Sequence, residues 1–391
     1  MSDPNDSAAL STIDDSSAFR SSTFLEFCAK VRNSDPSILP EPGEPLRILS
    51  SLSEKEDIEL ADALLENKSV TYLELDTEKY TRSSAEAMAK YVRTSKSLQR
   101  IRWKDSYRRS QQREEIICCF LHAFQESTSL KELHMHLLCF GRPSNLALEN
   151  MLTHTQSLRS LSLICPRGLL EDVAVAAVLS GLKKNTTLRE LTLVLSRDTT
   201  NICPLLTRLR DHPLLRRLCL SGYVGNLTGL ETLLLRDNSK ITELDIHRSG
   251  RCSPIIGLTS VFQAVARRRT LTKLGLRGVC LGRDEARQLG MVLYSTPSLQ
   301  TLVLTDCYLG SAGLAELAPA LYHNTSIKVL DISENTLNDM DSARCLRDIL
   351  RNNKTITTLD LSRNEFGETT GAVDCIADAL GSNSTLLKID L

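Results

Sequence analysis

Ile327-Lys-Val-Leu330-Asp-Ile332-Ser-Glu-Asn335 and Ile356-Thr-Thr-Leu359-Asp-Leu361-Ser-Arg-Asn364 are two copies of one pattern. We number it from its first apolar residue, so that apolar residues occupy positions 1, 4 and 6 and asparagine occupies position 9. Successive copies begin 26 to 32 residues apart, a spacing too regular to come from the abundance of leucine alone. With Ile, Val, Met or Trp allowed for Leu, the pattern L-x-x-L-x-L begins twelve times, at Val70, Leu98, Leu130, Leu158, Leu188, Leu215, Ile241, Leu271, Leu299, Ile327, Ile356 and Leu386.

Each copy predicts a short strand followed by a helix. Leu330 and Ile332 are two residues apart and point to one side of a strand, while Asp331 points to the other. Between copies, apolar residues follow helical spacing, as at Leu314, Leu317 and Leu321. One such unit cannot bury its apolar side alone, so the units must stack. We therefore expect an α/β solenoid with parallel strands on its concave face and helices on its convex face.

Two residue types predict local details of the connections. An asparagine three residues before position 1 can end the helix in a left-handed conformation. Pro319 lies inside an otherwise helical pattern, so we expect that helix to kink or to begin later. The asparagine occurs at Asn67, Asn185, Asn238, Asn324, Asn353 and Asn383.

In these motifs the sequence resembles leucine-rich-repeat proteins of the ribonuclease-inhibitor type, whose units of roughly 28 residues alternate a strand with a full helix. The resemblance covers about Leu46 to Leu391 and is most specific in the last four or five units. Before Leu271 it is looser, because position 9 holds Glu78, Ser106, Leu138, Pro166 or Tyr223. The resemblance implies a horseshoe that binds proteins, since the family includes a nuclease inhibitor, a GTPase activator and the sensor ends of immune receptors.

The sequence divides into two regions. Residues 1–45 predict a disordered acidic segment, a short helix near Phe24 and a Pro-rich linker. Residues 46–391 predict the array of about twelve units, with Leu46-Arg-Ile48-Leu as an N-terminal capping strand. The chain stops at Leu391 on a strand, so we expect either a longer array or a partner that covers this edge.

Composition favours a soluble cytoplasmic protein. The formal net charge is -1, which gives no general attraction to nucleic acid or to an anionic membrane. The first nineteen residues contain no Lys, no Arg and no apolar run, so they do not resemble a secretory signal. No apolar stretch of the chain is long enough to span a membrane. Twelve cysteines without a C-x-x-C pair indicate free thiols in a reducing compartment.

Motifs for chemistry are absent from the sequence. We find no metal-ligand spacing, no nucleotide-binding loop and no catalytic signature, so the sequence predicts no metal, no cofactor and no enzyme activity. Cys118 and Cys119 lie on an apolar helix pattern, which favours packing. The basic, aromatic stretch around Trp103 favours a solvated patch or a protein contact over nucleic acid, because Trp103 takes the buried position 6.

The leading functional prediction is a recognition module or scaffold that binds a partner protein on its concave face. Two alternatives remain: a GTPase activator acting in trans, and a ubiquitin-ligase adaptor, because residues 39–58 loosely resemble an F-box in which Pro42, Gly43 and Pro45 would break the first helix. In the last units, the L-D-L aspartates either serve solubility or engage a basic partner. The candidate binding residues are Arg100, Arg102, Lys104, Glu132, His134, His136, Asp331, Asp360 and Asp390.

Overall fold

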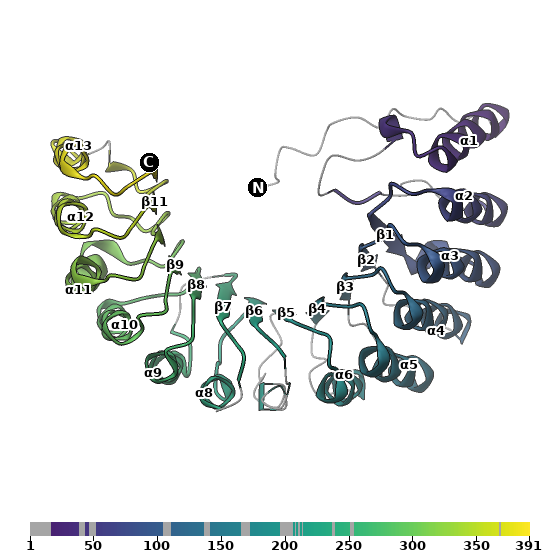
Figure 1. The fold of residues 1–391 in the computed structure, drawn as a ribbon, viewed down its shortest axis with the longest axis horizontal. Helices are drawn as coiled ribbons and strands as arrows, with labels where there is room; N and C mark the ends of the chain where they lie inside the picture. Colours follow the sequence, from purple (N-terminus) through teal and green to yellow (C-terminus); the bar gives the residue numbers. More distant parts are fainter. Residues whose placement is uncertain are drawn as a thin grey trace.

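Every predicted copy of the repeat forms a strand, and the strands pair in parallel in sequence order as one twelve-stranded sheet (Figure 1). The computed structural model describes residues 17–38, 44–46, 52–104, 111–136, 141–165, 173–195, 206–207, 209, 212, 214–236, 239–250, 254–366 and 369–391. The strands are β1 (Tyr72–Asp76), β2 (Arg100–Lys104), β3 (Glu132–His136), β4 (Ser160–Cys165), β5 (Glu190–Leu195), β6 (Arg217–Gly222), β7 (Glu243–Arg248), β8 (Lys273–Arg277), β9 (Thr301–Val303), β10 (Val329–Asp331), β11 (Thr358–Asp360) and β12 (Lys388–Asp390).

Helices connect the strands and lie on the outer side of the arc, with the sheet on its inner side (Figure 1). This arrangement confirms the predicted α/β solenoid. The array helices are α2 (Glu54–Glu66), α3 (Arg82–Thr94), α4 (Gln111–Glu126), α5 (Arg142–His154), α6 (Val173–Lys184), α8 (Leu230–Leu235), α9 (Leu258–Arg268), α10 (Arg283–Ser295), α11 (Gly310–His323), α12 (Met340–Asn352) and α13 (Ala372–Ser382), and two short 3₁₀ helices span Pro36–Ile38 and Thr77–Lys79.

The strands bury positions 4 and 6, because alternate side chains of a strand point to the same side, and the sheet register keeps equivalent residues side by side. Leu73 pairs with Ile101, and Ile101 pairs with Leu133, all fully buried at position 4. Trp103 at position 6 is also buried and packs edge-on against Phe124, with ring centroids 5.4 Å apart. The core is therefore a continuous column that runs through all the units.

Among the described residues, the asparagines before position 1 do not adopt the left-handed conformation that the sequence suggested. Asn353 is extended, with φ -73° and ψ 132°. Its Oδ1 accepts hydrogen bonds from the backbone N–H groups of Thr355 (2.8 Å) and Ile356 (2.9 Å), and its Nδ2 donates to the carbonyl of Leu321 (2.7 Å) in the preceding unit. The prediction was wrong because the side chain satisfies the connection's backbone groups, so no left-handed residue is needed.

The equivalent asparagines of four other units make the same two kinds of hydrogen bond. Each accepts from the backbone N–H of position 1 and donates to a carbonyl about one unit earlier, at Asn67, Asn185, Asn324 and Asn383. At Asn67 the Nδ2 atom, to which a glycan would be attached, donates to Val31 O at 2.6 Å. These asparagines also begin Asn-x-Ser/Thr sequences, the acceptor pattern for N-glycosylation. The pattern here is a consequence of the turn. Asn238 lies outside the described residues.

The position-9 asparagines form a second set of contacts between units. Asn364 accepts from the N–H of Asn335 (2.8 Å) and donates to the carbonyl of Ile332 (2.9 Å). Asn335 in turn accepts from the N–H of Cys307 at 3.0 Å. These bonds satisfy backbone groups where β10 and β11 end, which accounts for the strict motif in the last units.

Two helices depart from the common pattern. Helix α11 begins at Gly310 and runs through Pro319, so of the two alternatives, a kink or a later start, the later start was wrong. Pro319 is exposed on the outer side, where the carbonyl of Ala315 that loses its hydrogen bond can face water. Helix α8 has only six residues and begins after Gly229, whose backbone is left-handed with φ 95°.

The N-terminal region contains helix α1 (Ser17–Arg32), which covers the predicted helix and packs on α2. Leu46 makes one parallel bridge to Leu73, while residues 47–49 of the expected capping strand lie outside the described part, as do residues 1–16. Asp57 and Ile58, from the F-box-like stretch, lie within α2, which packs against α3.

The cysteines only partly fit the expectation of free thiols. Seven of the described cysteines are free thiols. Cys280, in contrast, is disulfide-bonded. The disulfide departs from the prediction of a uniformly reduced chain.

Candidate functional site

The concave face consists of the strand side chains at positions 3, 5 and 7, because positions 4 and 6 point into the core. All nine candidate residues occupy these positions. The structure brings six of them together on β2 and β3, where Arg100 pairs with Glu132 and Arg102 pairs with His134 in the register. We call these six residues, Arg100, Arg102, Lys104, Glu132, His134 and His136, the N-terminal patch. The three aspartates lie on β10 to β12, with strands β4 to β9 between the two groups.

The N-terminal patch is less cationic than its sequence suggests, because β1 places Glu74 beside it. The Lys104 ammonium lies 2.8 Å from a Glu74 carboxylate oxygen, and the Arg102 guanidinium lies 3.7 Å from the other. Arg100 lies over the Tyr72 ring, 4.7 Å from its centroid. Glu74 and Tyr72 were not among the candidate residues selected from the sequence, although their repeat positions, 5 and 3, match those of Arg102 and Arg100.

His134 is half-buried at the centre of this patch. Burial lowers the pKa of its imidazole, Glu132 raises it, and the nearby Arg102 and Arg100 lower it further, for a net decrease. His134 is therefore mainly neutral near neutral pH, and its ring can donate and accept hydrogen bonds there.

A second charged cluster occupies the middle of the arc and was not predicted. Arg217 of β6 and Lys273 of β8 flank Asp245 of β7, at 3.2 and 3.1 Å from its carboxylate. Gly275, at position 5 of the next strand, leaves room for that carboxylate, since a Cβ there would lie 2.2 Å from Asp245 Oδ1. Comparing positions 3 and 5 of adjacent units would have found this cluster.

The register aligns the three C-terminal aspartates, Asp331, Asp360 and Asp390, which we call the acidic ladder. Asp331 and Asp360 accept from the N–H groups of the serines two residues later, at 3.1 and 3.0 Å. Asp331 also accepts from the Thr305 hydroxyl at 2.9 Å, and Asp390 lies 2.6 Å from the Lys388 ammonium. Each of these half-buried carboxylates thus has a local role besides its place on the concave face.

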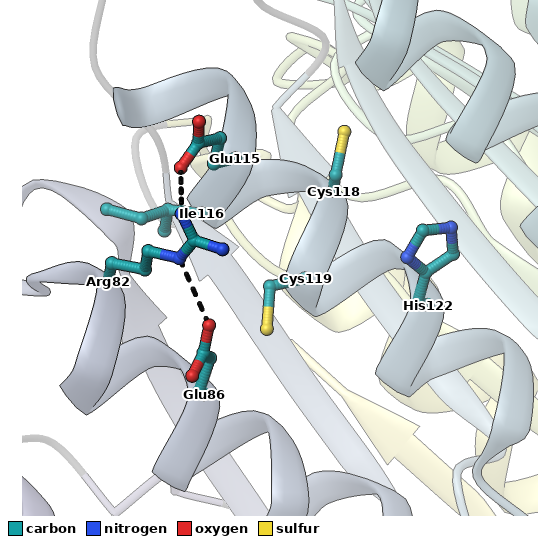
Figure 2. A pocket seen from close by; sticks show the side chains of 7 residues that line it. All are labelled: Arg82, Glu86, Glu115, Ile116, Cys118, Cys119 and His122. Carbon is teal, nitrogen blue, oxygen red and sulfur yellow. Dashed lines mark hydrogen bonds and ion pairs between the residues drawn. The ribbon is translucent and has the colours of Figure 1, made fainter. Parts of the chain in front are cut away.

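A hollow of about 280 Å³ lies on the convex side between α3 and α4 (Figure 2). Burial, with Glu114, Cys119 and Glu115, raises the pKa of Cys118 to about 11, and burial also raises that of Cys119. The thiols point in different directions, and no group of metal ligands occurs among the described residues. The hollow therefore lacks an activated thiolate and a metal site. Its lining is Arg82, Glu86, Glu115, Ile116, Cys118, Cys119 and His122.

Comparisons with known proteins identify relatives built from the same kind of repeat. The chain is 33% identical over 130 residues to human NACHT, LRR and PYD domains-containing protein 13, a match that covers 33% of this chain and 12% of that protein. It is 30% identical over 119 residues to chicken leucine-rich repeat-containing protein 45, covering 30% and 18% of the two chains. It is 28% identical over 289 residues to bovine NACHT, LRR and PYD domains-containing protein 5, covering 72% and 24%.

The matches thus span between 12 and 24% of the length of these relatives. No family model matches the chain. A solved structure of a Bacteroides fragilis protein aligns with a TM-score of 0.40 at 16% identity, over 61% of this chain and 66% of that chain, which is too distant to support an argument. Within the described residues, every helix is too short or too polar to cross a bilayer.

Proposed function

We propose that this chain, a leucine-rich-repeat protein of the ribonuclease-inhibitor type, binds a partner protein on its concave face and has no enzyme activity of its own. The observation that supports this proposal most strongly is the concave face itself, where β1 to β12 place charged and polar side chains in register over a rigid core. An extended, preorganised surface of this kind suits recognition of another protein.

The distribution of charge suggests how the partner is oriented. The N-terminal patch carries a cationic excess around Arg100, whereas the acidic ladder is anionic, and a partner with the opposite arrangement would be oriented along the arc. Because the ladder's carboxylates are already hydrogen-bonded, they are held in fixed positions, so little side-chain freedom would be lost on binding.

Site-specific photo-crosslinking in cells tests the choice of face. We expect a photoreactive residue at Thr192, on the concave side of β5, to capture a discrete partner protein. The matched control is Gln263, which is exposed on the convex helix α9. Capture from Gln263 and not from Thr192 would move the interface to the convex side and contradict the proposal.

Charge reversal tests the contribution of the acidic ladder once a partner has been captured. We expect Asp331→Lys combined with Asp360→Lys to slow association and to change its dependence on salt. The matched control reverses Asp341 and Asp374, which lie in the first turns of the convex helices α12 and α13. Equal association rates for both double variants, at all salt concentrations, would leave the ladder as ordinary surface.

Assays for the two alternatives would also overturn the proposal. Stimulation of GTP hydrolysis by small GTPases would show a GTPase activator. Co-purification of a Skp1-type subunit would show a ubiquitin-ligase adaptor. Against this alternative, Asp57 and Ile58 of the F-box-like stretch form part of α2, a helix of the array. Nothing among the described residues favours either activity.

We also propose a cytoplasmic location, which the sequence composition supports and the Cys280 disulfide opposes. Cell fractionation, with thiol labelling of the lysate, tests it. Recovery in the secretory compartments with Cys280 fully oxidised would refute a cytoplasmic location.

A further inference from the structure

Position 2 of the repeat forms a separate line of side chains along the edge where the strands begin. The backbone N–H of each position-2 residue donates to the carbonyl of the equivalent residue in the preceding unit. Arg159 donates to Lys131 (2.8 Å), Arg189 to Arg159 (2.7 Å) and Arg216 to Arg189 (2.7 Å). These four cations, which we call the basic column, are therefore consecutive neighbours, about 4.8 Å apart and about 14 Å from end to end.

The basic column is confined to these units. Gln99 precedes it and Thr242 follows it in the same line of hydrogen bonds. Further along, position 2 holds threonine, glutamine or leucine, with Lys328 as an isolated cation. The repeat itself therefore does not require a cation at position 2.

Within the described part of the chain, no carboxylate forms an ion pair with any of the four residues of the basic column. Cations of the concave face behave differently, since Arg217 and Lys273 both contact Asp245. Glu132 and Glu190 follow Lys131 and Arg189 in the sequence, but they lie at position 3, on the concave side.

Two arginines of the column, Arg159 and Arg189, are held by hydrogen bonds to the backbone, and the charges of neighbouring arginines affect one another. Arg159 Nη1 donates to the carbonyls of Gln156 (3.1 Å) and Leu158 (3.2 Å), and Arg189 Nη1 donates to those of Thr187 (2.9 Å) and Leu188 (3.2 Å). Burial lowers the pKa of Arg189, and the charges of Arg159 and Arg216 lower it further. An anion placed on the column would relieve this repulsion.

We propose that the basic column is a second binding surface, distinct from the concave face, which takes an extended acidic segment of a partner protein. Extended peptide advances about 3.3 Å per residue, so a segment of about five residues spans the column. A protein segment fits better than single-stranded nucleic acid, because nucleic-acid surfaces also present aromatic side chains on which the bases stack. Aromatic residues that could stack bases are absent from positions 1 to 3 of these units.

Fluorescence anisotropy with a labelled hexaglutamate peptide and the full chain tests the proposal. We expect binding that weakens with salt. Arg159→Gln, Arg189→Gln and Arg216→Gln together should weaken it about tenfold, the effect of losing three exposed ion pairs. Glutamine already occupies position 2 at Gln99 and Gln300, so the fold accommodates it. The matched control is Lys328→Gln, which should bind like the wild type.

Two further measurements make the outcome decisive. Replacing the same three arginines with lysine should restore binding, because the positive charges return. A labelled oligouridylate tests the other class of partner, and tighter binding of it through the same residues would overturn the proposal. Hexaglutamate binding that is equal in the wild type and in the folded glutamine variant would overturn it as well. Neither result would affect crosslinking from Thr192, so this surface and the concave face are tested independently.

Discussion

Replacing Asn353 with alanine tests whether the asparagine before position 1 joins neighbouring units. The side chain is almost fully buried and makes four hydrogen bonds to the backbone: it accepts from Thr355 and Ile356 and donates to Leu321 and Asn324. At about 1 kcal/mol for each bond, its loss should lower the free energy of unfolding by about 4 kcal/mol.

The neighbouring Asn352→Ala is the matched control. Asn352 is exposed and makes one side-chain hydrogen bond, to Asp348 O, so we expect a loss of about 0.5 kcal/mol or less. Urea unfolding followed by far-UV circular dichroism measures both variants. Asn353→Asp separates the two halves of the side chain, because it keeps the acceptor but turns the donor into a second acceptor that faces two carbonyls. If Asn353→Ala and Asn352→Ala lost the same stability, the asparagine turn would not hold the units together.

Three further variants test the core and two buried titratable groups by urea unfolding. Leu330→Ala should cost about 2 to 5 kcal/mol, and a loss below about 0.5 kcal/mol would show that Leu330 is not core. Burial raises the pKa of Asp57 to about 7, so its carboxyl stabilises the fold below pH 4 and loses this contribution as the pH rises toward 7. Asp57→Asn should therefore gain up to about 4 kcal/mol over the wild type above pH 7 and nothing near pH 4, and a gain independent of pH would refute this. Burial, and then Arg189, lower the pKa of His212 to about 4, so stability is lost as the pH falls from about 6.5 to 4. His212→Asn should remove this loss of up to about 3 kcal/mol, because asparagine does not titrate. The fold should accept it, since His212 lies three residues before position 1, where other units have asparagine. An unchanged pH profile would contradict this prediction.

The repeat predicted the strands well and the connections poorly. The burial of Leu133 and Met135 followed from periodicity, since alternate residues of a strand must face the core. The conformation of Asn353 did not, because it depends on hydrogen bonds to Leu321 and Asn324, which lie about one repeat earlier in the chain. The start of α11 before Pro319 did not follow from the sequence for a related reason: the cost of the missing N–H of Pro319 depends on whether that side of α11 faces water.

The structure places the candidate residues at odd strand positions and shows neighbours that the sequence analysis did not select. Odd strand positions predicted that Arg102 and Lys104 would point outward, and the structure adds that Glu74 pairs with both. The central cluster around Asp245 was missed because its two ion pairs, with Arg217 and with Lys273, join different units. Whether these residues bind a partner remains a prediction.

The sequence by itself determined the class of fold, the number of units and the side of each strand residue, because these depend on a local period that each unit repeats. Only the tertiary structure decided which charges compensate one another and which do not. That property depends on the register between units: it places Glu74 beside Lys104 and Asp245 beside Lys273, yet it leaves the four cations of the basic column stacked on one another. Electrostatic interactions act across the strands, between residues about thirty positions apart in the chain, whereas the repeat pattern reports only what lies along each strand.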